Sequence, residues 1–354
     1  MIPHAFGERD GLTLGIEEEL FVVDAESLEP APVPPEVLDG ERCKPELFRA
    51  VVELTTGVCA SVDEAAAELE ELRSGARRRA ADAGLALAAT GTWPTAIAQE
   101  QEITPDPGYL EFVEYAGSSA RRQFCSGLHV HVGVASPEAC MAALERVLPW
   151  LPVVLAASAN SPYLAGAETG LASTRAEILA LLPRSAGPPV FGSYEEWERF
   201  AERLVELGLA DRYTRIWWDV RPHPTFGTLE VRTPDQPTRL EVTVAFAALV
   251  QALVATANGT PPEAPADRGL YAQNRWAAAR FGAQAELVHP DGSHVVRADE
   301  LLAELLERVA PAAERLGTAA YLAPLEGLAQ ADAQLEHGRR EGLRSLCDGL
   351  VAAT

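Results

Sequence analysis

Three consecutive glutamates stand inside an apolar run in the stretch Gly15-Ile16-Glu17-Glu18-Glu19-Leu20. The apolar run extends from position 12 to 23 and predicts a β-strand. Side chains alternate between the faces of a strand, so Glu17 and Glu19 share one face and Glu18 points to the other. Two carboxylates in an apolar frame are costly to bury unless a cation or a proton lies between them. The pattern indicates either a site for a hard divalent cation such as Mg²⁺ or Mn²⁺, or the solvated face of an edge strand.

The composition narrows the class of protein. The chain has 354 residues and 47% hydrophobic content, enough for a large single domain or for two. Its 29 basic and 52 acidic residues give a net charge of -23, which disfavours nucleic-acid binding because an acidic surface repels phosphate. Lys44 is the only lysine, so an anionic cofactor would have to be held by arginines, backbone N–H groups or metal ions.

The cysteines and the chain's apolar segments bear on its location. Five cysteines, an odd number without a Cys-x-x-Cys pair, are typical of reduced thiols. The N-terminal residues lack a basic region followed by an apolar core, which argues against a secretory signal. No uncharged apolar run reaches about 18 residues, which argues against a membrane span. We expect a cytoplasmic protein without a membrane partner, and a homo-oligomer is compatible with the sequence.

Two histidines have the same i, i+2 spacing as Glu17 and Glu19. They lie in the apolar stretch Gly127-Leu128-His129-Val130-His131-Val132-Gly133-Val134. The alternation predicts a strand with both imidazoles on one face and apolar side chains on the other. Histidines two positions apart on a strand can reach one metal or phosphate site. They can equally be ordinary core or surface histidines, although the flanking glycines permit the close approach of a ligand.

Further acids lie on other predicted strands. A short apolar run at 50–54 carries Glu53, and the segments 215–222 and 227–235 predict a hairpin with Glu230 and Arg232 on one face. In most proteins such a pair is a simple salt bridge. Beside the other acids and the histidines, it also fits a metal ligand next to a phosphate clamp.

The remaining elements mix helices and strands without a βαβ rhythm, which predicts an α+β fold. Helical periodicity and capping boxes predict helices at 61–84, 137–155, 193–208, 238–257, 271–281, 297–317 and 331–351. A buried strand is expected at 85–90 and a second hairpin at 285–296. Residues 99–119, rich in proline, glycine and acids, predict a long mobile loop that could serve as a lid.

The strand-borne polar groups suit one kind of site. Carboxylates and imidazoles on antiparallel strands, with an arginine among them, could hold ATP through Mg²⁺ ions and stabilise a moving phosphoryl group. Neither a Walker GxxxxGK[ST] motif nor a GxGxxG motif followed by a helix is present in the sequence. The groups are Glu17, Glu19, Glu53, His129, His131, Glu230 and Arg232.

At these residues the chain resembles the ATP-dependent carboxylate-amine ligases related to type 2 glutamate–cysteine ligase. The resemblance covers about residues 12 to 345. Its motifs are Leu14-Gly15-Ile16-Glu17-Glu18-Glu19-Leu20, Thr90-Gly91-Thr92, His129-Val130-His131-Val132-Gly133, Ser158-Ala159-Asn160-Ser161-Pro162, Trp217-Trp218-Asp219-Val220-Arg221-Pro222, Leu229-Glu230-Val231-Arg232 and Asn274-Arg275-Trp276.

The resemblance implies a single catalytic domain over residues 1–354 with a glutamine-synthetase-like fold, in which a curved antiparallel sheet of about six strands forms a funnel backed by helices. It also implies phosphorylation of a substrate carboxylate by ATP, with the γ-carboxylate of glutamate as the expected case. An amine then attacks the acyl phosphate to form an amide. The expected partners are therefore small molecules, namely an amino acid such as glutamate and an amine.

The resemblance also implies roles for individual residues. Arg232 would stabilise the transferred phosphoryl group, and Glu53 is a second expected catalytic residue. Arg175 is expected to contact a substrate carboxylate and Arg275 a nucleotide phosphate, with His129 also near the nucleotide. The expected metal ligands are Glu17, Glu19, Glu53, His129, His131 and Glu230.

Two other functions stay open at this point. The same acids and histidines could activate water in a metal-dependent amidase or hydrolase, which would form product without ATP. A non-catalytic metabolite- or nucleotide-binding protein could keep the fold. The acceptor amine is not specified by these motifs.

Overall fold

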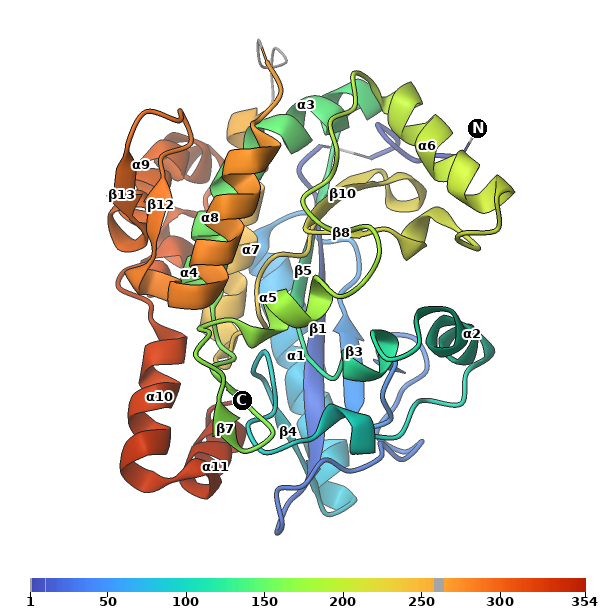
Figure 1. The fold of residues 1–354 in the computed structure, drawn as a ribbon, viewed down its shortest axis with the longest axis vertical. Helices are drawn as coiled ribbons and strands as arrows, with labels where there is room; N and C mark the ends of the chain where they lie inside the picture. Colours follow the sequence, from blue (N-terminus) through green and yellow to red (C-terminus); the bar gives the residue numbers. More distant parts are fainter. Residues whose placement is uncertain (1, 10, 258–263) are drawn as a thin grey trace.

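The computed structural model describes residues 2–9, 11–257 and 264–354, and in these ranges seven strands form one antiparallel sheet (Figure 1). The strand order is β10-β11-β5-β1-β3-β2, and β4 also pairs with β1. This arrangement confirms the predicted α+β class and its antiparallel sheet. The strands are β1 (Leu14–Asp24), β2 (Cys43–Pro45), β3 (Val51–Thr55), β4 (Leu85–Ala88), β5 (Leu128–Gly133), β10 (Val220–His223) and β11 (Thr228–Val231).

β1 is the central strand and carries the three glutamates. Its first half pairs with β5, with Glu17 opposite His129. Its last residues pair with β4, and its middle pairs with β3, with Glu19 opposite Glu53. Because β1 has neighbours on both edges, Glu17 and Glu19 do not lie on an edge strand.

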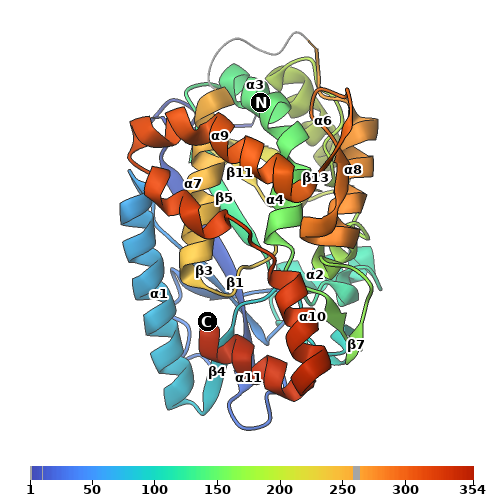
Figure 2. The same ribbon diagram turned by 90° about the vertical axis from the view of Figure 1, so that its left-hand side faces the viewer.

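Helices cover one face of the sheet. α1 (Val62–Asp82) and α7 (Leu240–Ala257) pack directly against the strands (Figure 2). α3 (Pro137–Val147) and α9 (Ala298–Leu316) pack against α7, and α4 (Leu151–Ser158) packs against α8 (Arg268–Phe281) and α9. The predicted capping box starts α1, since the Ser61 hydroxyl accepts a hydrogen bond from the backbone N–H of Glu64. α7 is buried on nearly every side, which accounts for its continuous apolar sequence.

Within the described ranges, two helical stretches have the length and composition to cross a membrane. They are Pro137–Ser158 and Leu240–Ala257, and 78% of the apolar window of each is buried inside the protein. The packing of a protein core explains this apolar character, so the two stretches are weak evidence for a membrane span.

Glu18 points into the helical layer and is completely buried there. Both of its carboxylate oxygens accept hydrogen bonds from Arg73 of α1, at 2.9 Å from Nε and 2.5 Å from Nη2. Gln236 Nε2 and the Thr243 hydroxyl, each 2.9 Å away, also donate to Oε1 of Glu18. This buried network joins β1 to both helices that back the sheet.

The structure differs from several of the predicted elements. The helix expected at 137–155 is divided into α3 and α4, and the strand expected at 215–222 is divided into β9 (Trp217–Trp218) and β10. The expected loop at 99–119 contains α2 (Pro107–Ala116), which Asp106 caps by accepting from the backbone N–H of Gly108. The predicted helix at 331–351 is two helices, because Gly342 has a φ of 85° and breaks it into α10 (Gln330–Glu341) and α11 (Leu343–Ala353).

The remaining elements lie around the edges of the sheet and the helical layer. α6 and α9 match their predicted helices closely, and the predicted hairpin at 285–296 is formed by β12 and β13. These elements are β6 (Tyr163–Leu164), β7 (Ala167–Glu168), α5 (Thr174–Leu179), β8 (Ser185–Ala186), α6 (Tyr194–Glu206), β9 (Trp217–Trp218), β12 (Glu286–Val288) and β13 (Val295–Arg297).

Candidate active site

The face of the sheet opposite α1 and α7 carries the predicted polar residues. Strand register places them side by side: besides the pairs on β1, Glu230 of β11 lies opposite His131 of β5 and opposite Arg221 of β10. Alternation along each strand then brings the sequence-predicted donors together on this face. They are Glu17, Glu19, Glu53, His129, His131, Glu230 and Arg232.

Glu17 lies between the two histidines. Its Oε2 is 3.1 Å from Nδ1 of His129, and its Oε1 is 3.4 Å from Nε2 of His131. Burial opposes the ionisation of Glu17, but the two imidazoles hold the pKa of Glu17 well below its usual range. Burial and the Arg232 charge lower the pKa of His129 to about 4, so this imidazole is neutral and available as a ligand.

The second ring nitrogen of His131 faces Glu17. Its Nδ1 lies 3.0 Å from the Thr228 hydroxyl, and its buried Nε2 lies 3.4 Å from Oε1 of Glu17. One donor atom each from Glu17, His131 and Glu230 lies within 4.8 Å of the others. A buried imidazole nitrogen oriented in this way fits a metal ligand whose other nitrogen is fixed by a hydrogen bond.

Glu230 is paired with two arginines. Arg221 donates to both of its carboxylate oxygens, at 2.6 Å from Nε and 3.1 Å from Nη2, and Nη1 of Arg232 contacts Oε1. Burial opposes the ionisation of Glu230, but these guanidinium groups and His131 hold its pKa well below the usual range. The sequence reasoning quoted Arg221 within a motif but gave it no role.

A second acidic group comprises Glu19, Glu46 and Glu53. Burial is the main cause that raises the pKa of Glu19 to about 7 and that of Glu46 to about 8, and charge repulsion within the group adds to it. Burial and the Glu17 charge also raise the pKa of Glu53, although Lys44 lies 3.2 Å away. The sequence reasoning missed Glu46, which directly follows β2 and lies outside the strands that alternation predicted.

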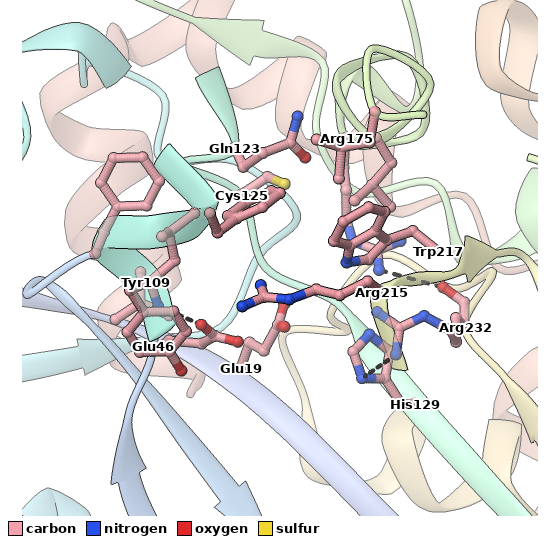
Figure 3. A pocket seen from close by; sticks show the side chains of 16 residues that line it. Glu19, Glu46, Tyr109, Gln123, Cys125, His129, Arg175, Arg215, Trp217 and Arg232 are labelled. Atoms are coloured by element: carbon pink, nitrogen blue, oxygen red, sulfur yellow. Dashed lines mark hydrogen bonds between the residues drawn. The ribbon is translucent and has the colours of Figure 1, made fainter. Parts of the chain in front are cut away.

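Two members of this group, Glu19 and Glu46, line a cavity of about 130 Å³ (Figure 3). Glu19 and Glu46 lie on one side of the cavity, and Arg175, Arg232 and His129 lie on the other. The wall between them is largely apolar and includes two residues of α2, the helix in the expected lid region. The other lining residues are Leu47, Phe48, Val51, Tyr109, Phe112, Gln123, Cys125, Leu179, Leu182, Arg215 and Trp217.

Arg175 reaches the cavity from the first turn of α5. Its guanidinium donates to the backbone carbonyls of Arg232 at 3.2 Å and Thr233 at 3.3 Å, and it lies 3.9 Å from the buried Asp235 carboxylate. It passes directly over Gly127, where an added Cβ would be 1.9 Å from Nη2. A glycine at 127 is therefore required for Arg175 to occupy this position.

The structure does not bring Arg275 to the cavity. Its Nε donates to Asp219 at 2.7 Å and its Nη2 to the carbonyl of Ala176 at 2.9 Å, while Nη1 is 3.4 Å from Glu177. The expected contact with a nucleotide phosphate is thus at odds with the geometry, because these buried contacts occupy the guanidinium. Arg275 instead anchors α5, the helix that carries Arg175.

Comparison with known proteins identifies the family of the chain. The model of glutamate–cysteine ligase family 2 (GCS2) matches residues 13–349. The chain is 41% identical to a protein of Rubrobacter xylanophilus named "Putative glutamate--cysteine ligase 2-3", over 99% of each chain. It is 38% identical to "Putative glutamate--cysteine ligase 2" of Sorangium cellulosum, over 98% of this chain and 97% of that relative.

Solved structures show the same fold at low sequence identity. The crystal structure of a glutamate–cysteine ligase from Francisella tularensis in complex with AMP has a TM-score of 0.71 at 14% identity, over 98% of this chain and 89% of that one. A bifunctional glutathione synthetase from Pasteurella multocida has a TM-score of 0.64 at 13% identity, over 97% of this chain and 50% of that one. The predicted ligase fold and the predicted relationship are both confirmed, and the chain belongs to glutamate–cysteine ligase family 2.

Proposed function

We propose that this chain is an ATP-dependent carboxylate-amine ligase that activates the γ-carboxylate of glutamate as an acyl phosphate and joins it to an amine. The observation that carries the proposal is the convergence of carboxylates, imidazoles and Arg232 on one sheet face beside a cavity that holds a further arginine. We assign the activity to one catalytic domain over residues 1–354. Membership of a ligase family supports the reaction class.

The donor set fits Mg²⁺ in two neighbouring positions. The first is the group of Glu17, His131 and Glu230, where the buried Nε2 of His131 faces the Glu17 carboxylate. The second is the acidic group of Glu19, Glu46 and Glu53, and His129 is a further proposed ligand. Oxygen-rich sites of this kind suit hard divalent cations, and Mn²⁺ is an alternative. Bound Mg²⁺ would neutralise the ATP phosphates and orient the γ-phosphoryl group.

The arginines supply the rest of the electrostatics. Arg232 lines the cavity, and its guanidinium is held by Glu230, which Arg221 holds in turn from the other side. A guanidinium fixed in this way is preorganised to stabilise charge on the transferred phosphoryl group. Arg175, across the cavity from Glu19, is suited to bind a substrate carboxylate.

The reaction balances without a side-chain nucleophile. An oxygen of the glutamate γ-carboxylate attacks the γ-phosphorus of ATP, and ADP leaves. The amine nitrogen then attacks the acyl carbon, loses a proton, and releases inorganic phosphate as the amide forms. The enzyme positions the reactants and stabilises charge in both steps. We assign Glu53 as the second catalytic residue, as the sequence predicts.

Trapping the acyl phosphate tests this function. With glutamate, ATP and Mg²⁺, hydroxylamine should replace the amine and give γ-glutamyl hydroxamate with an equivalent amount of ADP. Cysteine is the first natural acceptor to test, because the relatives carry that ligase name. Mass spectrometry of products from a panel of amines then identifies the preferred acceptor.

Two controls sharpen the assay. Glu19→Gln should lose hydroxamate formation, whereas Glu195→Gln, on the exposed surface of α6, should keep it. Cleavage of a γ-glutamyl amide without ATP would instead identify a hydrolase. ATP-independent product, or no turnover with any amino acid and amine, would overturn the proposal.

A further inference from the structure

A second group of potential metal ligands lies far from the cavity, on the turn of the β12–β13 hairpin. One donor atom each from His289, Asp291 and His294 lies within 4.8 Å of the others. The hairpin is at the edge of the molecule beyond α8, so the helical layer separates it from the site face of the sheet (Figure 1). None of these residues lines the cavity described above.

The two nitrogens of His289 face two different carboxylates. Nε2 lies 3.0 Å from Oε1 of Glu304 on α9, and Nδ1 lies 2.8 Å from Oδ1 of Asp291. With a proton on Nε2, donated to Glu304, Nδ1 is an acceptor that faces Asp291, whose backbone N–H also lies 3.2 Å from it. Two electron-pair donors at that distance need a proton or a metal ion between them. A carboxylate behind the imidazole is the usual support of a metal-bound histidine.

His294 completes the group from the other strand end. Its ring is stacked on that of His289 with the centroids 4.9 Å apart. Its Nδ1 lies 2.8 Å from the Ser293 hydroxyl, which leaves Nε2 for a ligand. Two imidazoles and one carboxylate with an open side toward solvent form a common three-ligand set for Zn²⁺.

Hydrogen bonds hold the turn that carries these side chains. The backbone N–H of His289 donates to the carbonyl of His294 at 2.8 Å, and the N–H of Gly292 donates back to the carbonyl of His289 at 2.8 Å. Gly292 has a φ of 76°, which suits glycine. Asn274 of α8 bonds both the N–H and the carbonyl of Val288 just before the turn. The ligands are therefore held close together by the backbone before any ion binds.

We propose that His289, Asp291 and His294 form a binding site for a borderline divalent cation of the Zn²⁺ class, distinct from the Mg²⁺ positions of the active site. Glu304 orients His289 from behind. The bound ion joins the hairpin to α9 through this contact, so it stabilises the C-terminal helical layer.

Zinc titration of the full chain in excess Mg²⁺ tests the site. Zn²⁺ is added in competition with a chromogenic chelator, and thermal melting is followed in parallel. The wild type should bind one more equivalent of Zn²⁺ than His294→Asn and should melt at a higher temperature with Zn²⁺ than without it. Glu304→Gln should weaken binding about tenfold, as expected for an outer partner of a ligating histidine.

A matched histidine variant separates this site from general surface binding. His337 lies 3.6 Å from Glu341 on α10, outside the cluster, so His337→Asn should bind Zn²⁺ as the wild type does. Equal stoichiometry and affinity in the wild type and in His294→Asn would overturn the proposal. So would a wild type whose melting temperature does not respond to Zn²⁺.

Discussion

Glutamates on the two faces of β1 have different environments. On the helical face, Glu18 is fully buried and both its oxygens are bonded by Arg73, with further donors from Gln236 and Thr243. On the open face, Glu19 lies beside Glu53 and near Glu46, and the group has raised pKa values. Arg73 neutralises the Glu18 carboxylate within the protein. The group of Glu19, Glu46 and Glu53 has fewer neighbouring positive charges than carboxylates.

This contrast separates structural from functional acids. A buried carboxylate with a dedicated guanidinium needs nothing from outside, and its loss should damage folding. Carboxylates gathered without enough cations are destabilising by themselves, so a ligand that neutralises them explains their retention. A substitution on the helical face should therefore mainly lower stability, and a substitution on the open face should mainly lower turnover.

The largest expected effect is on turnover, from Arg232→Lys on the open face. A compact ammonium cannot reproduce the planar guanidinium that contacts Glu230 and faces the cavity. We expect kcat for hydroxamate formation to fall by about 10³-fold or more. The free energy of unfolding, measured with urea, should change far less than for a residue on the helical face. Wild-type kcat would make Arg232 a purely structural partner of Glu230.

The next largest effect is on stability, from Glu18→Gln on the helical face. The substitution leaves the Arg73 guanidinium buried without its counter-charge. We expect a loss of about 3–5 kcal/mol in the free energy of unfolding, measured in urea. The double variant Glu18→Gln with Arg73→Met should recover part of that loss, because the unpaired charge is gone. Unchanged stability in Glu18→Gln would remove the distinction between the two faces.

Removal of Mg²⁺ should affect the open face of the sheet and leave the helical face unchanged. At a Mg²⁺ concentration 100 times its Kd, binding should stabilise the wild type by about 2.7 kcal/mol, and chelation should reverse this. Glu46→Gln should reduce the Mg²⁺-dependent rise in melting temperature, because one expected oxygen ligand is lost. Glu68→Gln, at a carboxylate of α1 that pairs with Arg42, is the control and should respond to Mg²⁺ as the wild type does. An unaltered response in Glu46→Gln would exclude Glu46 from the metal site.

The smallest effect should come from Arg275→Lys, an arginine outside the cavity. It loses part of its bonding to Asp219 and Ala176, which we expect to cost about 1 kcal/mol in the free energy of unfolding. The KM for ATP should stay unchanged, and the KM for glutamate should rise modestly because α5 carries Arg175. A rise in the KM for ATP instead would support the phosphate contact expected from the sequence.

The sequence predicted the elements of the site well because strand alternation is a local property. The spacing of Glu17 and Glu19, and of His129 and His131, was enough to assign a shared face within each strand. It could not give the partners across strands, which depend on register. Glu46 escaped notice because it lies outside the predicted strands, where spacing carries no information about the direction of a side chain.

Other differences arise from long-range contacts and capping. Arg73 is one of several arginines on a predicted helix, and only the fold shows that it meets Glu18. The proline at 107 suggested a loop, but proline suits the first turn of a helix, and α2 begins there after Asp106. Arg275 was placed at the nucleotide by resemblance, and only the tertiary structure shows its buried partners.

The Glu18 network also bears on the order of folding. Its partners are separated from Glu18 by 55 residues at Arg73, 218 at Gln236 and 225 at Thr243. Contacts between residues so far apart in the chain form late, because the chain must lose the entropy of loop closure before the contact can stabilise it. Until α7 docks, the carboxylate stays hydrated and the centre of β1 resists burial. The strand that carries the active-site acids can therefore be sealed into the core only after residues from both halves of the chain have assembled, which couples formation of the site to completion of the whole fold.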